Sequence, residues 1–476
     1  MSSRAVGERP AVWLITVIAL VGRLAVLWQP MRYDESVTWA YFVGRPWSTV
    51  VSSYPFPNNH VLFSLLAKLT SSVAPYQPWA LRLPAFVAGV AIVPLTWAVG
   101  RRFASPAVGL LGAAFAAAST SLILYSTNAR GYTIVVALFL VLLLLADRLR
   151  VASQPVNWVL VALLGALGLY TIPVMLYPLG VVAVWLLTAG YSARGGERRR
   201  LGAGVVLACA AAGGLAFLLY LPIIRTAGLG ALSANSFVEP SGWSAFFTAV
   251  PRHAVETLLA WTSPLPWWTS PLLVAAAVAG ARRVRQGGRP SLALATLLWC
   301  GLLLAVTHRV PFVRVWLFLL PLFHLAVARG AVRIAAGTRV GGAVASPLGA
   351  VLSAACLAAL ALGGDTARRS NDTGTFRAAR DVTARLARDL RPGDRVLAPI
   401  PTNGPLLYYF GASGVDTALL NTPPALTRRA FLVLEPARGR TLEWAVSVGM
   451  IDPARYREPT LVLRRPDVEV WRSERR

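Results

Sequence analysis

The sequence predicts an all-α polytopic membrane protein with a small α/β domain at its C-terminal end. Of its 476 residues, 56% are hydrophobic and only 14% are charged, whereas about a quarter of the residues of a soluble chain carry charge. Apolar runs of about 18 to 25 residues recur through the first three-quarters of the chain, and each can cross a bilayer core about 30 Å thick. In lipid these runs must be helices, because unpaired backbone groups there are costly.

The length criterion predicts about eleven transmembrane helices. They are expected at residues 11–28, 80–99, 105–124, 131–146, 157–170, 172–189, 201–224, 267–281, 290–307, 311–328 and 340–362. The first run follows Arg4 and Arg9, as the apolar segment of a cleaved signal peptide would. The residues after it, Gln29 to Tyr33, are too bulky for a cleavage site, so we expect an uncleaved span.

The placement of arginine predicts the orientation of these helices. Short loops between the predicted spans hold arginines, namely Arg101, Arg102, Arg148, Arg150, Arg194, Arg198, Arg199, Arg200, Arg282, Arg283, Arg285, Arg289, Arg329, Arg333 and Arg339. Short loops rich in Lys and Arg stay in the cytoplasm. The net charge of +26 is therefore interpreted as a membrane-orientation signal, and no nucleic-acid partner is expected. We expect a multi-pass protein of the inner (plasma) membrane.

An odd number of spans places the C-terminal region outside the cytoplasm. We predict a transmembrane domain at residues 1–362 and a small α/β extracytoplasmic domain at residues 363–476. Two long outer loops, residues 29–79 and 225–266, are rich in Trp, Tyr and Pro, which favour the headgroup level. Segments 59–73 and 243–261 within these loops are candidate interfacial helices.

The C-terminal region is charged and shows short mixed elements. An apolar stripe predicts one helix, which ends at Arg391-Pro392-Gly393-Asp394. Strands are expected at Arg395–Ala398, Ala430–Leu434, Thr460–Leu463 and Val468–Trp471, with a turn at Arg465-Pro466-Asp467. We expect this domain to pack over an outer active site rather than to carry out catalysis.

The first candidate for chemistry is the pair Asp34-Glu35, which directly follows the first span. Adjacent carboxylates near a low-dielectric surface are costly unless they are paired or used. A solvated loop pair is the simple alternative, but the neighbouring residues are aromatic and apolar, which favours function. One of these carboxylates could then deprotonate an acceptor hydroxyl.

Three further groups lie in predicted outer loops. In Pro57-Asn58-Asn59-His60, the asparagines could cap the next helix, and His60 could bind a phosphate or a sugar hydroxyl. In the Asn128–Tyr132 stretch, Arg130 could grip a phosphate through two hydrogen bonds. In the His308–Trp316 stretch, Arg314 could reach lipid headgroups or bind the phosphate of a lipid substrate.

Several classes of site are not indicated. Cys209, Cys300 and Cys356 all lie in apolar runs without a pairing pattern, so no disulfide and no metal site is assigned. The sequence has no Walker-type loop, zinc-ligand spacing or nucleophile elbow. A nucleotide-sugar donor and ATP-driven transport are therefore not favoured, and we expect no cofactor.

At these residues the sequence resembles the GT-C superfamily of membrane glycosyltransferases, in particular its ArnT-like and protein mannosyltransferase-like branch (PMT, glycosyltransferase family 39-type). The matching features are Asp34-Glu35 after the first span, Pro57 to His60 before an interfacial helix, and Arg130-Gly131-Tyr132 at the start of a span. Arg314 with Leu320-Pro321 is similar to a late arginine–aromatic–leucine–proline segment of the family, although Val315 replaces the aromatic residue. The resemblance covers residues 10–330.

The resemblance implies a GT-C-like fold and a hexosyl- or pentosyltransferase of the cell envelope. The donor would be a sugar on a polyprenyl phosphate, and the acceptor a lipid, a glycan or a protein. Asp34 maps to the catalytic base position, with Glu35 as an auxiliary carboxylate and inversion at the anomeric carbon. The residues expected to bind substrate are Tyr33, Asn58, Asn59, His60, Arg130, Tyr132, His308 and Arg314.

A polytopic transporter or flippase of a lipid-linked or small substrate is the alternative function. Transporters often carry paired charges within their spans. Here the predicted spans hold almost no acidic residues, and the polar residues gather in outer loops. This distribution favours an enzyme.

Overall fold

The computed structural model describes residues 3–189, 195–232, 238–281, 292–364, 376–420 and 427–476. The chain divides into two compact units. The first unit comprises residues 1–27, 47–67 and 82–367, and the second comprises residues 28–46, 68–81 and 368–476. Two segments of the first predicted outer loop thus belong to the same unit as the C-terminal region, and the predicted boundary at residue 362 remains a prediction.

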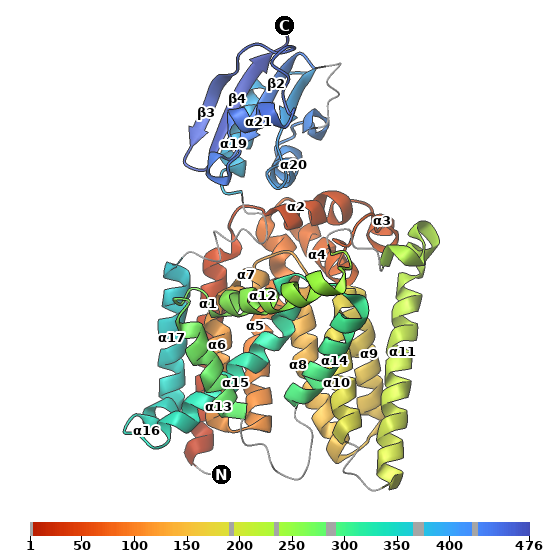
Figure 1. Ribbon diagram of the computed structural model, residues 1–476, viewed down its shortest axis with the longest axis vertical. Coiled ribbons are helices and arrows are strands. Elements are labelled where there is room, and N and C mark those ends of the chain that lie inside the picture. Colours follow the sequence, from red (N-terminus) through yellow and green to blue (C-terminus); the bar gives the residue numbers. More distant parts are fainter. Residues whose placement is uncertain (1–2, 190–194, 233–237, 282–291, 365–375, 421–426) are drawn as a thin grey trace. The chain divides into compact units, whose positions relative to one another are not determined.

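The first unit is built from helices, and α8 lies at its centre (Figure 1). Its longer helices are α1 (Ser3–Leu27), α5 (Pro78–Phe103), α6 (Pro106–Ala118), α8 (Tyr132–Val151), α9 (Pro155–Thr171), α10 (Leu176–Ala189), α11 (Gly195–Ala227), α12 (Trp243–Thr262), α13 (Thr269–Ala281), α14 (Leu292–Thr307), α15 (Leu320–Ala335) and α17 (Pro347–Gly363). The shorter ones are α3 (Trp47–Ser52), α4 (Val61–Val73), α7 (Thr120–Ser126), α16 (Gly341–Val344) and the 3₁₀ segments η2 (Pro173–Met175), η4 (Leu229–Leu232) and η5 (Val313–Leu319). Residues 68–73 of α4 and 78–81 of α5 are part of the second unit.

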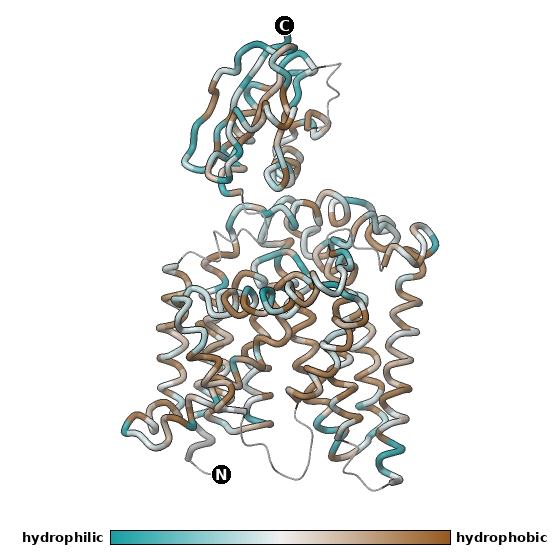
Figure 2. The backbone as a smooth tube through the Cα atoms, in the orientation of Figure 1, coloured by the Kyte–Doolittle hydropathy of each residue, from teal (hydrophilic) through white to brown (hydrophobic). Residues whose placement is uncertain are grey.

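The prediction of a helical polytopic membrane protein with a small α/β domain is confirmed. Each of the eleven predicted spans coincides, in its described residues, with one helix or with two consecutive helices. By length and composition, four described helices can cross a membrane alone, or five if the bent pair α6–α7 forms one span. Six further apolar helices of 10–17 residues accompany them. Figure 2 shows the apolar residues concentrated along these helices.

Some predicted features lie outside the described residues. These are Arg194 and the cluster Arg282, Arg283, Arg285 and Arg289. The two helices predicted within the outer loops are present as α4 and α12. In Figure 1, α12 runs at a steep angle to the long helices α11 and α17, which is the orientation that an interfacial helix would need.

A buried arginine stabilises the break between α6 and α7, where the axis bends by 60°. Arg23 on α1 is fully buried and donates to the carbonyl oxygens of Ala116 (3.3 Å) and Ala117 (3.0 Å). Its Nε also donates to the Ser126 hydroxyl at 3.0 Å. The bend leaves carbonyl groups at the end of α6 without helical partners. Arg23 therefore finds its hydrogen-bond partners inside the bundle, as a charge within a span requires.

The second unit contains a four-stranded sheet in the order β1-β2-β4-β3. The strands are β1 (Asp394–Leu397), β2 (Arg429–Leu434), β3 (Thr460–Arg465) and β4 (Val468–Glu474). β1 pairs with β2 in parallel, and the other two pairings are antiparallel. The four predicted strands and the turn between β3 and β4 are confirmed. Helices of the unit are α2 (Tyr33–Thr38), α19 (Ala379–Asp389), α20 (Asn403–Ala412) and α21 (Leu442–Ser447), with the segments η1 (Trp39–Val43), η6 (Thr417–Leu420) and η8 (Pro436–Arg438).

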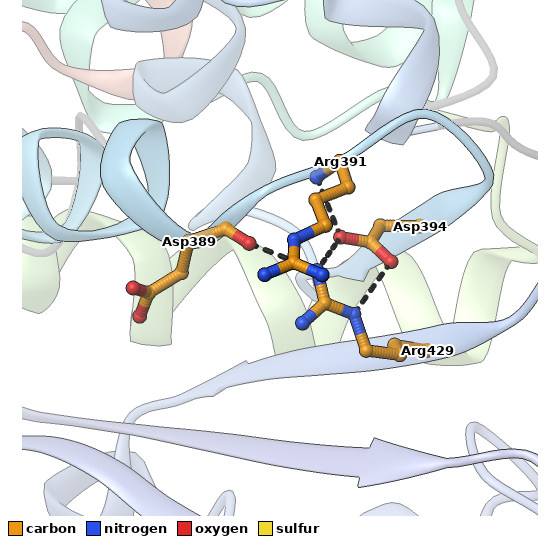
Figure 3. A network of polar contacts seen from close by, with 4 residues as sticks. All are labelled: Asp389, Arg391, Asp394 and Arg429. Carbon is orange, nitrogen blue, oxygen red and sulfur yellow. Dashed lines mark hydrogen bonds and ion pairs between the residues drawn. The ribbon is translucent and has the colours of Figure 1, made fainter.

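An ion-pair network joins β1 to β2 (Figure 3). Arg429 donates from Nε to Asp394 Oδ1 at 2.9 Å and from Nη2 to Asp394 Oδ2 at 2.6 Å. The same guanidinium reaches the backbone oxygen of Asp389, and the Arg391 N–H also donates to the Asp394 carboxylate. Because Asp394 is 1% exposed, its charge depends on these donors. The network secures the end of α19 against the sheet.

Replacing the carboxylate of this network should loosen the sheet. We expect Asp394→Asn to lower the local free energy of unfolding by about 2 kcal/mol, which speeds amide exchange in β1 and β2 about 30-fold. Hydrogen exchange on the full-length protein measures this. The matched control is Asp381→Asn, since Asp381 is 61% exposed in its pair with Arg465 and should have little effect. Equal exchange in the two variants would contradict a stabilising role for the network.

Candidate functional site

His60 and Gly131 bring together two sequence motifs that lie 71 residues apart. His60 directly precedes α4, and its Nδ1 accepts a hydrogen bond of 2.9 Å from the Gly131 N–H. Gly131 is the N-cap of α8, and a Cβ added there would lie 2.4 Å from Thr171 Cγ2. The close packing explains this glycine, because its φ of −79° is open to any residue. Since Nδ1 accepts, a neutral His60 carries its proton on Nε2.

The charge state of His60 follows from its surroundings. It is 2% exposed. Burial, followed by the positive charges of Arg130 and Arg314, holds the pKa of His60 well below its ordinary value. The imidazole is therefore neutral near pH 7, and it can donate from Nε2 without adding a third positive charge to the site.

Tyr132 links His60 to Arg314. The Tyr132 hydroxyl accepts a hydrogen bond of 3.1 Å from Arg314 Nε, and its ring meets the His60 ring edge-on at 5.2 Å. Arg314 lies in η5, a 3₁₀ segment within the predicted span 311–328, and it packs 4.0 Å from the Phe312 ring centroid. 3₁₀ turns are frequent at the start of α-helices, and η5 leads directly into α15.

Arg130 is a buried cation with unused donors. It is 3% exposed, and its Nε and Nη1 lie buried without a hydrogen-bond partner among the described residues. Its one ring contact recorded there is with Tyr132, 5.9 Å from the ring centroid. Asn128 is fully buried, and neither its Oδ1 nor its Nδ2 has a partner within the same part of the chain. Such groups are costly in a folded protein unless a ligand satisfies them.

Asn59 and His308 have structural partners. The Asn59 amide donates to the carbonyl oxygens of Val50 (2.9 Å) and Ser53 (3.0 Å), and its oxygen accepts from the Ser64 hydroxyl. It thus secures the end of α3 against α4. The His308 ring packs 3.9 Å from Trp243, and no described contact joins it to the His60–Arg130 cluster. Substrate contact by Asn58, Asn59 and His308 stays a prediction.

The predicted carboxylates belong to the second unit, in the first turn of α2. Glu35 is fully buried, and its Oε2 accepts a 2.9 Å hydrogen bond from the Arg32 N–H, which caps the helix. Asp34 is half-buried. Burial, with the neighbouring Asp34 charge, raises the pKa of the Tyr33 hydroxyl. The two acids thus differ in setting, because the described contacts of Glu35 are structural whereas Asp34 keeps partial access to solvent.

Helix α2 is held by the C-terminal region of the same unit. The Met31 N–H donates to the hydroxyl of Tyr409 on α20 at 3.0 Å. A Cβ added to Gly404, also on α20, would lie 2.7 Å from Tyr33 Cδ2. Trp39, which follows α2, packs on Tyr408 at 5.6 Å. The position of Asp34 therefore depends on residues about 370 positions later in the chain.

Sequence reasoning missed Asn128, Tyr54 and His253. The sequence indicates Asn128 only as part of the Asn128–Tyr132 stretch, because the full burial of its side chain depends on the folded structure. Tyr54 is 6% exposed, and burial raises its pKa to about 12, although Arg130 acts in the opposite direction. His253 on α12 accepts a 2.8 Å hydrogen bond from Trp316 of η5, the segment that carries Arg314. Among the described residues, no cluster of His, Cys, Asp and Glu could hold a metal ion.

In its fold the chain is similar to the solved ArnT structures, which have the GT-C polytopic fold. ArnT from Cupriavidus metallidurans in the apo state aligns over 97% of both chains, with a TM-score of 0.61 and 15% identity. The same enzyme bound to undecaprenyl phosphate aligns over 97% of both chains, with a TM-score of 0.58 and 14% identity.

A second GT-C protein also aligns. The Archaeoglobus fulgidus oligosaccharyltransferase, in complex with Zn and sulfate, covers 97% of this chain and 72% of its own, with a TM-score of 0.51 and 10% identity. No protein-family profile matches the sequence, and no curated protein matches it. At these identities the likeness establishes the fold, and the activity is argued separately.

The low pKa of His60 should make folding sensitive to acid. The unfolded chain gains a proton at His60 below about pH 6.5, whereas the folded chain does not, so stability falls as the pH drops below that value. His60→Asn keeps an acceptor for the Gly131 N–H but does not titrate there. As the pH drops below that value, the free energy of unfolding should fall less steeply for His60→Asn than for the wild type. The expected difference between the two slopes is about 1.4 kcal/mol per pH unit. Unfolding in detergent at several pH values tests this, and equal slopes would contradict it.

The contact between Tyr33 and Gly404 should control the order of α2. Gly404→Ala places a Cβ against Tyr33 and should speed amide exchange in residues 33–38. Gly411→Ala on the same helix is the matched control, because its Cβ would meet Tyr76 at an ordinary 3.5 Å. Alanine has a higher helix propensity than glycine at both positions. The two variants therefore differ in the close contact with Tyr33, which only Gly404→Ala creates. Hydrogen exchange on the intact protein measures the difference, and similar rates in both would show that α2 does not depend on α20.

Proposed function

We propose that the protein is a membrane glycosyltransferase that moves a sugar from a polyprenyl-phosphate donor to an acceptor hydroxyl, with inversion at the anomeric carbon. The observation that carries the proposal is the buried Arg130, whose Nε and Nη1 have no partner among the described residues. The GT-C fold and the solved ArnT complex with undecaprenyl phosphate support the donor class. The acceptor would be a lipid, a glycan or a protein.

The phosphate of the donor would lie against Arg130 and Arg314. Both guanidinium groups lie against Tyr132, whose ring also meets the His60 ring. Two like charges in a low-dielectric cluster repel each other, and an anion between them would relieve that repulsion. A phosphate can accept two parallel hydrogen bonds from a guanidinium group. Neutral His60 would donate to the donor from Nε2, and Asn128 could bond to the phosphate or to the sugar.

The transfer step would be an in-line displacement. The Asp34 carboxylate takes the proton of the acceptor hydroxyl while the acceptor oxygen bonds to the anomeric carbon. The bond between that carbon and the phosphate oxygen breaks, and its electron pair stays on the phosphate. Negative charge thus grows where Arg130 and Arg314 would already be fixed, so they would stabilise the transition state with little rearrangement.

The other predicted residues would serve the same reaction. Glu35 would act as an auxiliary carboxylate that fixes the start of α2 and so orients Asp34. Tyr132 would hold Arg314 through its hydroxyl. Tyr33, Asn58, Asn59 and His308 are proposed to contact substrate. The arginine-rich short loops support an inner-membrane orientation with the active site and the C-terminal domain on the extracytoplasmic side.

Donor binding and chemistry can be separated in one experiment. Protein reconstituted in liposomes is given a radiolabelled polyprenyl-phosphate sugar and a pool of membrane acceptors. Asp34→Asn should bind the donor as the wild type does and lose transfer by about 100-fold or more. Arg130→Gln should weaken donor binding by about 10- to 100-fold. The matched control is Arg252→Gln, since Arg252 is 82% exposed in its pair with Glu256.

Each outcome decides between functions. Equal transfer by wild type and Asp34→Asn would remove Asp34 from the mechanism. Equal donor binding by Arg130→Gln and Arg252→Gln would remove Arg130 from the phosphate site. Movement of the labelled donor across the vesicle membrane without any transfer product would instead support a flippase.

A further inference from the structure

The first unit contains a cavity that shares no residue with the proposed transfer site. It has a volume of about 150 Å³ and lies among α6, α12, α13, α15 and α17. Phe115, Leu273, Val327 and Leu360 are among its apolar walls. Within the described part of the chain, no Asp, Glu, Lys or Arg lines it. A charged ligand would therefore find no counter-charge there.

Besides the hydroxyl groups of Ser119, Thr262 and Ser263, the lining holds an indole and an imidazole. Trp261 Nε1 and His324 Nδ1 are both buried, and neither has a hydrogen-bond partner among the residues that the structure describes. His324 is 6% exposed and sits in the apolar helix α15, edge-on to the Phe115 ring. By contrast, the Thr262 hydroxyl on the same wall pairs with Ser270 at 2.7 Å. The unused hydrogen-bonding capacity is thus concentrated on one indole and one imidazole.

This combination specifies a class of ligand. An indole N–H is only a donor, and a neutral imidazole Nδ1 either donates or accepts. A hydroxyl group can accept a hydrogen bond from the Trp261 N–H and donate one to His324 Nδ1. An ester carbonyl oxygen can only accept, so it can pair with the Trp261 N–H. Apolar walls with a few polar atoms are typical of sites for largely apolar ligands. A cavity of this volume admits about as much as one benzene molecule, so it would receive only the polar linkage and the first carbons of a chain.

We propose that this cavity binds an uncharged membrane lipid through a hydroxyl or ester group held by Trp261 and His324. The lack of charged walls excludes the phosphate of the proposed donor from it. The site therefore stands independently of the proposed transfer reaction, and an inactive protein would still show it.

The test uses a photoreactive diacylglycerol whose diazirine lies close to the ester. The full-length protein in detergent micelles is labelled, digested and mapped by mass spectrometry. We expect saturable labelling of residues 261–273 and 323–327, competed by unlabelled diacylglycerol. A phosphatidic acid probe with the same chains should label these peptides at least 5-fold less, because its charge has no partner there.

Two pairs of variants separate ligand binding from packing. His324→Leu should lose labelling at least 5-fold while its melting temperature stays equal to or above that of the wild type, since it removes an unpaired buried atom. Leu360→Trp should block the cavity and lose labelling. Leu352→Trp is its matched control, because Leu352 lies on the same helix α17, is similarly exposed and does not line the cavity.

The proposal would be overturned by any of three results. In the first, both probes label the peptides equally, which would indicate unspecific contact with lipid. In the second, His324→Leu labels as the wild type does but melts at a lower temperature, which would indicate a structural role with internal water as partner. In the third, Leu360→Trp and Leu352→Trp behave alike, which would place the label outside the cavity.

Discussion

The burial of positive charge in an apolar bundle is the constraint on which the site of the first unit depends. Arg23 and Arg130 are both almost fully buried. Arg23 meets the constraint with carbonyl oxygens freed at a helix break and with a serine hydroxyl. Arg130 has no such acceptors for Nε and Nη1 within the described chain. Because the same bundle can satisfy a guanidinium group completely, the open donors of Arg130 are better explained by a ligand than by tolerance of poor packing.

The same constraint explains the groups around Arg130. A protonated His60 would be a third cation beside Arg130 and Arg314, and its depressed pKa avoids this. Tyr132 supplies a neutral oxygen to Arg314 and a ring face to Arg130. Neither contact neutralises the positive charge of Arg130 or Arg314. The cluster therefore keeps a strong attraction for an anion in a region where water competes weakly.

Much of this arrangement could be predicted from the sequence, because it rests on local patterns. Hydropathy predicts the helices, and alternation with turn residues predicts the four strands. The predicted topology singles out Arg130, His60 and Arg314, because it places them in outer loops. The sequence does not predict the full burial of Asn128, the 3₁₀ geometry at Arg314 or the packing of α2 on α20. The hydrogen bonds beside these features join residues 71, 182 and 378 positions apart, and no single stretch of sequence records such contacts.

The packing of α2 on α20 also gives the C-terminal region a part in supporting Asp34. A helix of six residues is not stable by itself in water, so the cap by Glu35 and the packing on α20 are needed to keep Asp34 in one orientation. That packing requires a glycine at position 404, where a side chain would strike Tyr33. Packing over an active site, the role expected for this domain from the sequence, stays a prediction. The contacts within the second unit make the C-terminal residues part of the support of the proposed base, so a change in α20 should affect the proposed transfer without touching any substrate.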